Sequence, residues 1–132
     1  MQVVTPADFL HVAQNYLNNA SHESEFRAVA SRAYYSIFHA CDGYYASGKY
    51  TLIPSAESVG SHEVLFSAFL NASPNRCGKD WATIKRIGMM ANSTLKPLRR
   101  DADYDLKKSF PKINAELMVE KAKVILGEIS NI

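Results

Sequence analysis

Arg32, Ser36 and His39 are the residues whose types and spacing suggest chemistry. They are separated by four and three positions, so they share one face of a helix, together with Gly43. Cleavage of RNA without a metal needs a base for the 2′-hydroxyl proton and a cation for the phosphate, and histidine and arginine suit these two tasks. At about 1.5 Å of rise per residue, Arg32 and His39 lie roughly 10 Å apart along the axis, so a second helix or a second subunit must complete such a site.

The helix that positions these residues carries a separate apolar stripe with the same alternation of three and four. An alternating strand would scatter both sets over two faces, so the pattern indicates a helix from about Ser24 to Ser47, with Gly48 as its stop. One face of this helix is expected to be buried in a bundle. The stripe consists of Phe26, Ala30, Ala33, Ile37, Ala40 and Tyr44.

Four further helical segments are expected. Thr5 and Pro6 begin a helix that ends near Asn19, a short helix starts with Ser61 as its cap, and the last helix follows Pro111. Residues 48–60 and 71–80 are expected to be loops, and the last helix is expected to end near residue 130. The prediction is an all-α, up-and-down bundle of four long helices and one short helix, in a single domain spanning 1–132.

The helix that begins at Trp81, the fourth in chain order, is expected to be kinked. Its apolar stripe keeps its phase across Pro97, which predicts one bent helix and not two separate ones. Gly88 and Ala91 are small, so a neighbouring helix is expected to approach closely there. The stripe consists of Trp81, Ile84, Gly88, Ala91, Leu95, Leu98 and Ala102.

The composition is that of a folded protein. Of 132 residues, 47% are hydrophobic and 21% are charged, and the formal net charge of +2 is too small to indicate nucleic-acid binding by itself. Cys41 and Cys77 have no spacing typical of a metal site, so they are expected to be reduced thiols, and neither a metal nor a cofactor is predicted. The N-terminal residues do not resemble a signal peptide and no run approaches the roughly 20 apolar residues of a membrane span, so a cytoplasmic location without membrane attachment is expected.

Three segments together resemble the HEPN superfamily, in the branch of small stand-alone bacterial and archaeal proteins. Ala28–Cys41, AVASRAYYSIFHAC, is similar to the RAYYAxFHA helix of that branch. Ser61–Phe69, SHEVLFSAF, resembles its short helix that begins with histidine, and Leu98–Leu106, LRRDADYDL, resembles its RxxADY segment. The order and spacing of the segments fit, and the resemblance covers roughly residues 5 to 130.

The resemblance implies a helical homodimer that binds a partner of the nucleotidyltransferase type, or a nucleotide or RNA, in a toxin–antitoxin or defence system. Many HEPN proteins are metal-independent ribonucleases with an arginine, a polar residue, and a histidine after four to six intervening positions. Arg100 and Asp101 begin such a signature, but no histidine follows at residues 105–107. Arg32 and His39 have six residues between them, with Ala33 in the polar position. The alternative function is therefore a metal-independent endoribonuclease in which Arg32 and His39 are catalytic.

The residues expected to bind a nucleotide or RNA lie on two helices. A basic patch suits phosphates, although it can equally serve to solubilise the kinked helix. It consists of Lys96, Arg99, Arg100, Lys107 and Lys108. Arg99 and Arg100 can also pair with Asp101 and Asp103 on a solvated helix face. His39 can equally be a half-buried histidine bonded to a carboxylate, and the tyrosines can be core and interface rings. The expected binding residues are Ser36, Arg99, Arg100, Asp103 and Tyr104.

Two tertiary expectations follow. Buried polar groups need partners, so the second helix and the fourth helix in chain order, which carries Arg100 and Asp103, are expected to be neighbours. Asp103 is expected to accept a hydrogen bond from Arg32 or His39, with Arg100 at the rim of the same cleft. The surplus of aromatic residues predicts a homodimer with an isologous helical interface. The rings expected there are Tyr34, Tyr35, Phe38 and Tyr45.

Overall fold

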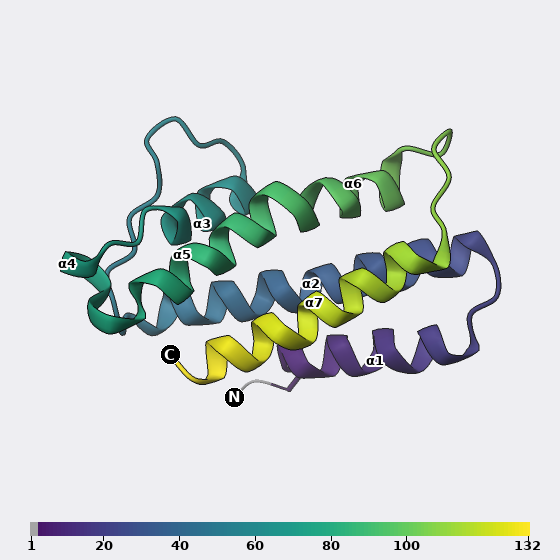
Figure 1. Ribbon diagram of the computed structural model, residues 1–132, viewed down its shortest axis with the longest axis horizontal. Helices are drawn as coiled ribbons and strands as arrows, with labels where there is room; N and C mark the ends of the chain where they lie inside the picture. The colour runs from purple at the N-terminus through teal and green to yellow at the C-terminus, as the bar shows by residue number, and fades with distance from the viewer. Residues whose placement is uncertain (1–2) are drawn as a thin grey trace.

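The computed structural model describes residues 3–132, and all regular structure in this range is helical (Figure 1). The predicted all-α class is confirmed. The longer elements are α1 (Pro6–Asn19), α2 (Glu23–Ser47), α3 (Ser61–Leu70), α5 (Trp81–Met90), α6 (Lys96–Tyr104) and α7 (Lys112–Ser130).

The ends of the first two helices follow the local sequence. Thr5 caps α1 through a capping box with Asp8, in which each side chain bonds the other residue's backbone N–H. Gly48 ends α2 in the left-handed conformation, with φ of 70°, which glycine adopts without steric cost. The expected boundaries of both helices are therefore confirmed to within one residue.

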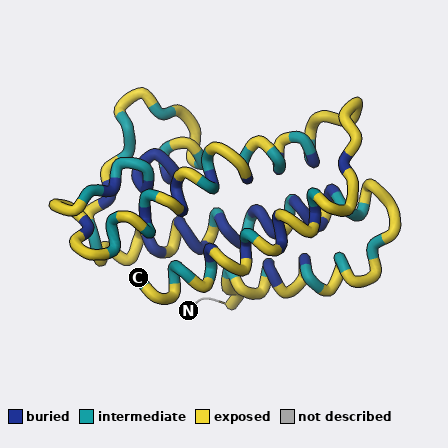
Figure 2. Tube along the Cα trace, viewed as in Figure 1, coloured by how far each residue is buried: buried dark blue, intermediate teal, exposed yellow. Residues whose placement is uncertain are grey.

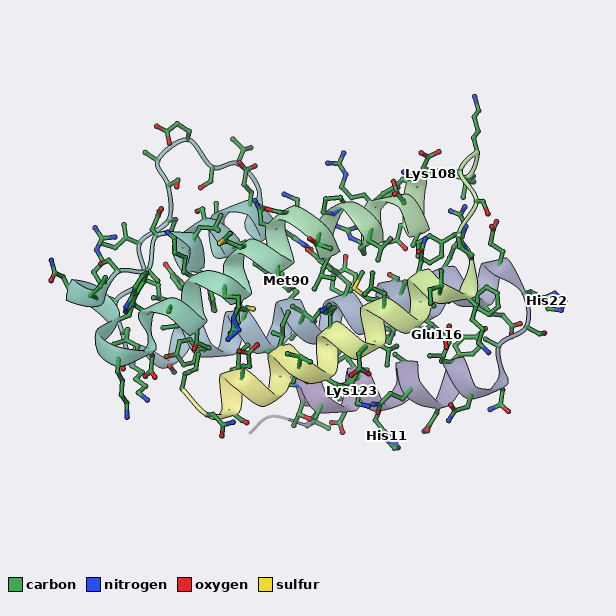
Figure 3. All side chains as sticks on the ribbon, viewed as in Figure 1. His11, His22, Met90, Lys108, Glu116 and Lys123 are labelled. Carbon is green, nitrogen blue, oxygen red and sulfur yellow. The ribbon has the colours of Figure 1, made fainter. Side chains whose placement is uncertain are left out.

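The helix across Pro97 is continuous from α5 to α6, as predicted. Its irregularity is a π-helical turn, Ala91–Leu95, directly before Lys96 and Pro97. Proline lacks a backbone N–H and its ring clashes with the preceding turn, so a locally wider turn lets the chain continue as a helix. Met90, labelled in Figure 3, lines a hollow of about 220 Å³ together with Val124 and Ile125 of α7.

Helix α2 lies at the centre of the bundle. It packs against α1 and α7 and also against α6 and α3, while α3 packs on α5 (Figure 1). The predicted packing of the second helix against the helix that carries Arg100 and Asp103 is therefore confirmed, because α2 packs against α6. The buried part of the chain follows α2 and the faces turned toward it (Figure 2), and its fully buried side chains on α2 include Val29, Tyr34, Ile37 and Cys41.

At Gly88, α5 approaches α3 closely. A Cβ added there would lie 2.7 Å from Cβ of Phe69 and 2.9 Å from the backbone N of Leu70. Any larger residue at this position would clash with α3, so the expected close approach of a neighbouring helix at Gly88 is confirmed.

Two local expectations were wrong. Residues 71–80 were expected to form a polar loop, but they contain α4 (Pro74–Cys77) and a 3₁₀ turn (Gly78–Asp80), and Cys77 is buried. Pro74 suits the first position of a helix, which favours the extra turn. Ser61 does not cap α3, because Gly60 occupies the cap position and Ser61 is the first helical residue.

Candidate functional site

Arg99 of α6 lies among three tyrosine rings. Its Cζ is 5.0 Å from the ring centre of Tyr34 and 5.8 Å from those of Tyr35 and Tyr104. The residue is only 8% exposed, and its Nε is buried without a hydrogen-bond partner among residues 3–132. The rings attract the positive charge, but none of the three tyrosine hydroxyls accepts a hydrogen bond from Nε.

Asp103 lies beside this guanidinium, one helical turn further along α6. Its Oδ2 is 3.5 Å from Nη1 of Arg99 and accepts a hydrogen bond of 3.3 Å from the hydroxyl of Ser31 on α2. Both contacts are long and both involve Oδ2. The Asp103 side chain is 26% exposed, so solvent reaches part of it.

Tyr34 and His62 form the other side of the site. The Tyr34 hydroxyl is 2.6 Å from Nδ1 of His62, and the Phe38 ring stacks on the imidazole with ring centres 4.3 Å apart. Burial raises the pKa of Tyr34 above its ordinary value of 10.0, and the charge of Arg99 opposes that rise only in part. Desolvation lowers the pKa of His62 below 6.5, and the nearby charges of Arg99, Lys96 and His39 lower it further.

These two pKa directions favour one polarity for the hydrogen bond between Tyr34 and His62. The phenol of Tyr34 stays protonated, and its hydrogen needs an acceptor, which the guanidinium of Arg99 is unable to provide. Tyr34 therefore donates to Nδ1 of His62, and the neutral imidazole keeps its own hydrogen on Nε2. The site thus presents His62 Nε2 as a donor and the Asp103 carboxylate as an acceptor.

Arg27 holds the end of α6 against α2. One of its Nη atoms donates to the carbonyls of Asp101, Ala102 and Asp105, and the other donates to the carbonyl of Lys108. The last carbonyls of a helix have no partner within the helix, so one buried fork satisfies several of them. This anchor places Asp103 and Tyr104 next to α2.

The outer side of α6 is open. A shallow hollow of about 530 Å³ is lined by Pro97, Arg100, Asp101, Tyr104 and Asp105. Tyr104 is 73% exposed, and its ring belongs both to this hollow and to the surroundings of Arg99. The ring therefore connects the half-buried cluster to the surface.

Arg32 lies outside this cluster, and His39 borders it: its ring centre is 6.2 Å from that of Tyr35 and 5.6 Å from that of Phe38. Both contact Phe9 of α1: Cζ of Arg32 is 5.2 Å from the ring centre, and the His39 ring centre is 5.0 Å from it. Both are exposed, and within residues 3–132 neither donates a hydrogen bond to Asp103. The expected bond from Arg32 or His39 to Asp103 was wrong, because Ser31, one residue earlier on α2, faces α6 instead.

Two further expectations about side chains need correction. Ser36 is fully buried and donates to the carbonyl of Ala33 in its own helix, so it does not reach a ligand on the surface. Tyr34, which was expected at an interface between subunits, is also fully buried within one chain. Tyr35 and Phe38 are partly exposed, and Tyr45 is 37% exposed.

Sequence reasoning placed Arg99, Asp103 and Tyr104 among the binding residues, and the structure brings these three together. It missed Ser31, His62 and Arg27. His62 is 28 positions from Tyr34 and beyond a loop, so no helical period connects the pair. The one available signal was that His62 begins the short helix in the HEPN-like pattern.

Comparisons with models of protein families, with curated proteins and with solved structures find no match for this chain. Within residues 3–132, no helix combines the length and the apolar composition that a bilayer span requires. The same part of the chain contains no group of three or more histidine, cysteine or acidic side chains arranged to hold a metal ion.

Proposed function

We propose that this chain is a HEPN-like module that binds a nucleotide or single-stranded RNA at the Arg99 cluster. The observation that carries the proposal is the buried guanidinium of Arg99, which Tyr34, Tyr35 and Tyr104 surround and whose Nε has no hydrogen-bond partner in the described part of the chain, residues 3–132. An unmet buried donor costs about 1–3 kcal/mol, and more for a charged group. A ligand that supplies an oxygen or nitrogen acceptor would remove that cost.

The surroundings of Arg99 suit a base and a phosphate together. Tyr104 offers an exposed ring face, and stacking of a base on an aromatic side chain contributes about 1–3 kcal/mol. Arg100 lies in the open hollow beside this ring, where a phosphate would meet its charge. Lys96 is near enough to lower the pKa of His62, so it adds positive charge on the α3 side of the site.

Binding of a fluorescently labelled single-stranded oligoribonucleotide, followed by anisotropy at two salt concentrations, tests the proposal. Tyr104→Ala removes an exposed ring, and we expect it to weaken binding about tenfold. Tyr16→Ala is the matched control, because Tyr16 is also exposed but lies on α1. Equal binding by the two variants, or no binding by the wild-type protein, would contradict the proposal.

We propose further that the module works as a homodimer with a nucleotidyltransferase-type partner in a toxin–antitoxin or defence system, as the HEPN-like segments imply. Partly exposed Tyr35 and Phe38 and exposed Tyr45 on α2 support an interface on this helix. Light scattering at micromolar concentration should report about twice the chain mass of 14.7 kDa. A mass of one chain would exclude the dimer.

A second candidate function is metal-independent cleavage of RNA by Arg32 and His39. It is favoured by the contact of both exposed side chains with the one ring of Phe9, beside a hollow of about 300 Å³ lined by Arg32, Phe9 and Val12. RNA incubated with the protein in EDTA should be cut by the wild type and by His11→Ala, but not by His39→Ala. Intact RNA would remove this candidate and leave the binding proposal standing.

A further inference from the structure

We infer that the site prefers guanine among the bases, and that the carboxylate of Asp103 is the group that selects it. This inference rests on the proposed nucleotide or RNA binding at the Arg99 cluster. It concerns the edge of the base, whereas the proposed function concerns its ring face and its phosphate.

The carboxylate of Asp103 is anchored and still has acceptor sites to offer. The Ser31 hydroxyl and the Arg99 guanidinium both contact Oδ2, at 3.3 and 3.5 Å. An ionised carboxylate has about four lone-pair directions on its two oxygens, so Oδ1 and part of Oδ2 remain for a ligand. Because two donors from different helices hold the group, its two oxygens are oriented before a ligand arrives.

Guanine matches two adjacent carboxylate oxygens better than the other bases do. Its N1–H and its 2-amino group are neighbouring donors that point the same way, so one carboxylate accepts both. Adenine and cytosine present one amino group on this edge, and uracil presents one imino N–H. The guanine O6 on the same edge is an acceptor, which suits the donors of Arg99 and His62.

The position of Tyr104 brings the base to this carboxylate. Tyr104 follows Asp103 in the chain, and both lie beside the Arg99 guanidinium. Cζ of Arg99 is 5.8 Å from the ring centre of Tyr104, and Nη1 of Arg99 is 3.5 Å from Oδ2 of Asp103. Tyr104 is 73% exposed, so a base can stack on its free face. In the inferred complex the edge of this base reaches over to Asp103, which lies outside the lining of the hollow beside Tyr104. Arg27 holds this end of α6 in place, which keeps the ring and the carboxylate in one arrangement.

Calorimetric titration of the protein with GMP, IMP and AMP tests the inference. IMP differs from GMP only in lacking the 2-amino group, so it isolates one hydrogen bond to a charged acceptor. We expect wild-type protein to bind GMP about tenfold or more tightly than IMP and AMP. Asp103→Asn should bring the three affinities together, because the amide keeps one acceptor and replaces the other by a donor. Asp42→Asn, on the exposed surface of α2, is the matched control and should keep the preference.

The outcomes separate the two proposals. Equal affinities for GMP, IMP and AMP in wild-type protein would overturn the inference and leave nucleotide binding standing. Binding of none of the three, together with no binding of the oligoribonucleotide, would overturn both. A tenfold preference that survives in folded Asp103→Asn would show that another group selects the base. The comparison of GMP with IMP needs no variant, so it shows whether the site prefers guanine even if Asp103→Asn does not fold.

Discussion

Replacement of Gly88 by alanine tests the tight contact between α5 and α3. The added Cβ would lie 2.7 Å from Cβ of Phe69, 2.9 Å from the backbone N of Leu70 and 3.1 Å from the carbonyl carbon of Phe69. Two of these three atoms belong to the backbone of α3, so no side-chain rotation relieves the clash. Helices α3 and α5 would have to move apart.

The expected magnitude combines two opposing effects. Overpacking of a tight contact costs about 1–3 kcal/mol, while alanine in a helix interior gains about 0.8–1.0 kcal/mol over glycine. Because α3 buries Leu65, Phe66 and Phe69 in the core, separation of the helices also loosens those side chains. We therefore expect Gly88→Ala to lower the free energy of unfolding by about 1–2 kcal/mol or more.

Gly43→Ala is the control of opposite sign. Gly43 lies in the interior of α2, and a Cβ there meets nothing within 4 Å. This variant should gain up to about 1 kcal/mol from helix propensity alone. Urea denaturation followed by circular dichroism at 222 nm gives both values. A Gly88→Ala protein as stable as the wild type, beside a stabilised Gly43→Ala protein, would refute the close approach of α3 to α5.

Three further predictions concern single residues. Arg27→Met should lower the free energy of unfolding by about 3 kcal/mol or more, because several buried carbonyls lose their donor. Urea denaturation measures this loss, with Arg76→Met at an exposed position as the control. A loss below about 1 kcal/mol would contradict the prediction. Because the pKa of His62 is lowered in the folded protein, the unfolded chain binds more protons than the folded chain as pH falls below 6.5. The free energy of unfolding should therefore decrease as pH falls below that value. Melting measured at several pH values should show a weaker decrease for His62→Gln. Pro97→Ala should retain the helix with similar or higher stability, since the missing backbone bond is restored; a large loss of helicity by circular dichroism would show that the irregular turn is needed.

The sequence by itself determined the helices, because their signals are local. The period of α2 from Phe26 to Tyr44, the cap at Thr5 and the stop at Gly48 each depend on neighbours within one turn. The same locality explains the continuity of α5 and α6, where the apolar stripe on both sides of Pro97 kept one phase. The helical turn at Pro74 had a local signal too, but it is too short for any period to show.

Only the tertiary structure decided which polar residues meet. Along α2, Ser31 and Arg32 are adjacent in sequence but about 100° apart around the helix, so Ser31 contacts Asp103 while Arg32 contacts Phe9. Which of the two faces α6 depends on how α1 and α6 pack around α2, and no spacing within α2 encodes that choice. The pairing of Tyr34 with His62 likewise depends on where the loop after α2 returns the chain, because the hydrogen bond joins residues that no helical period relates.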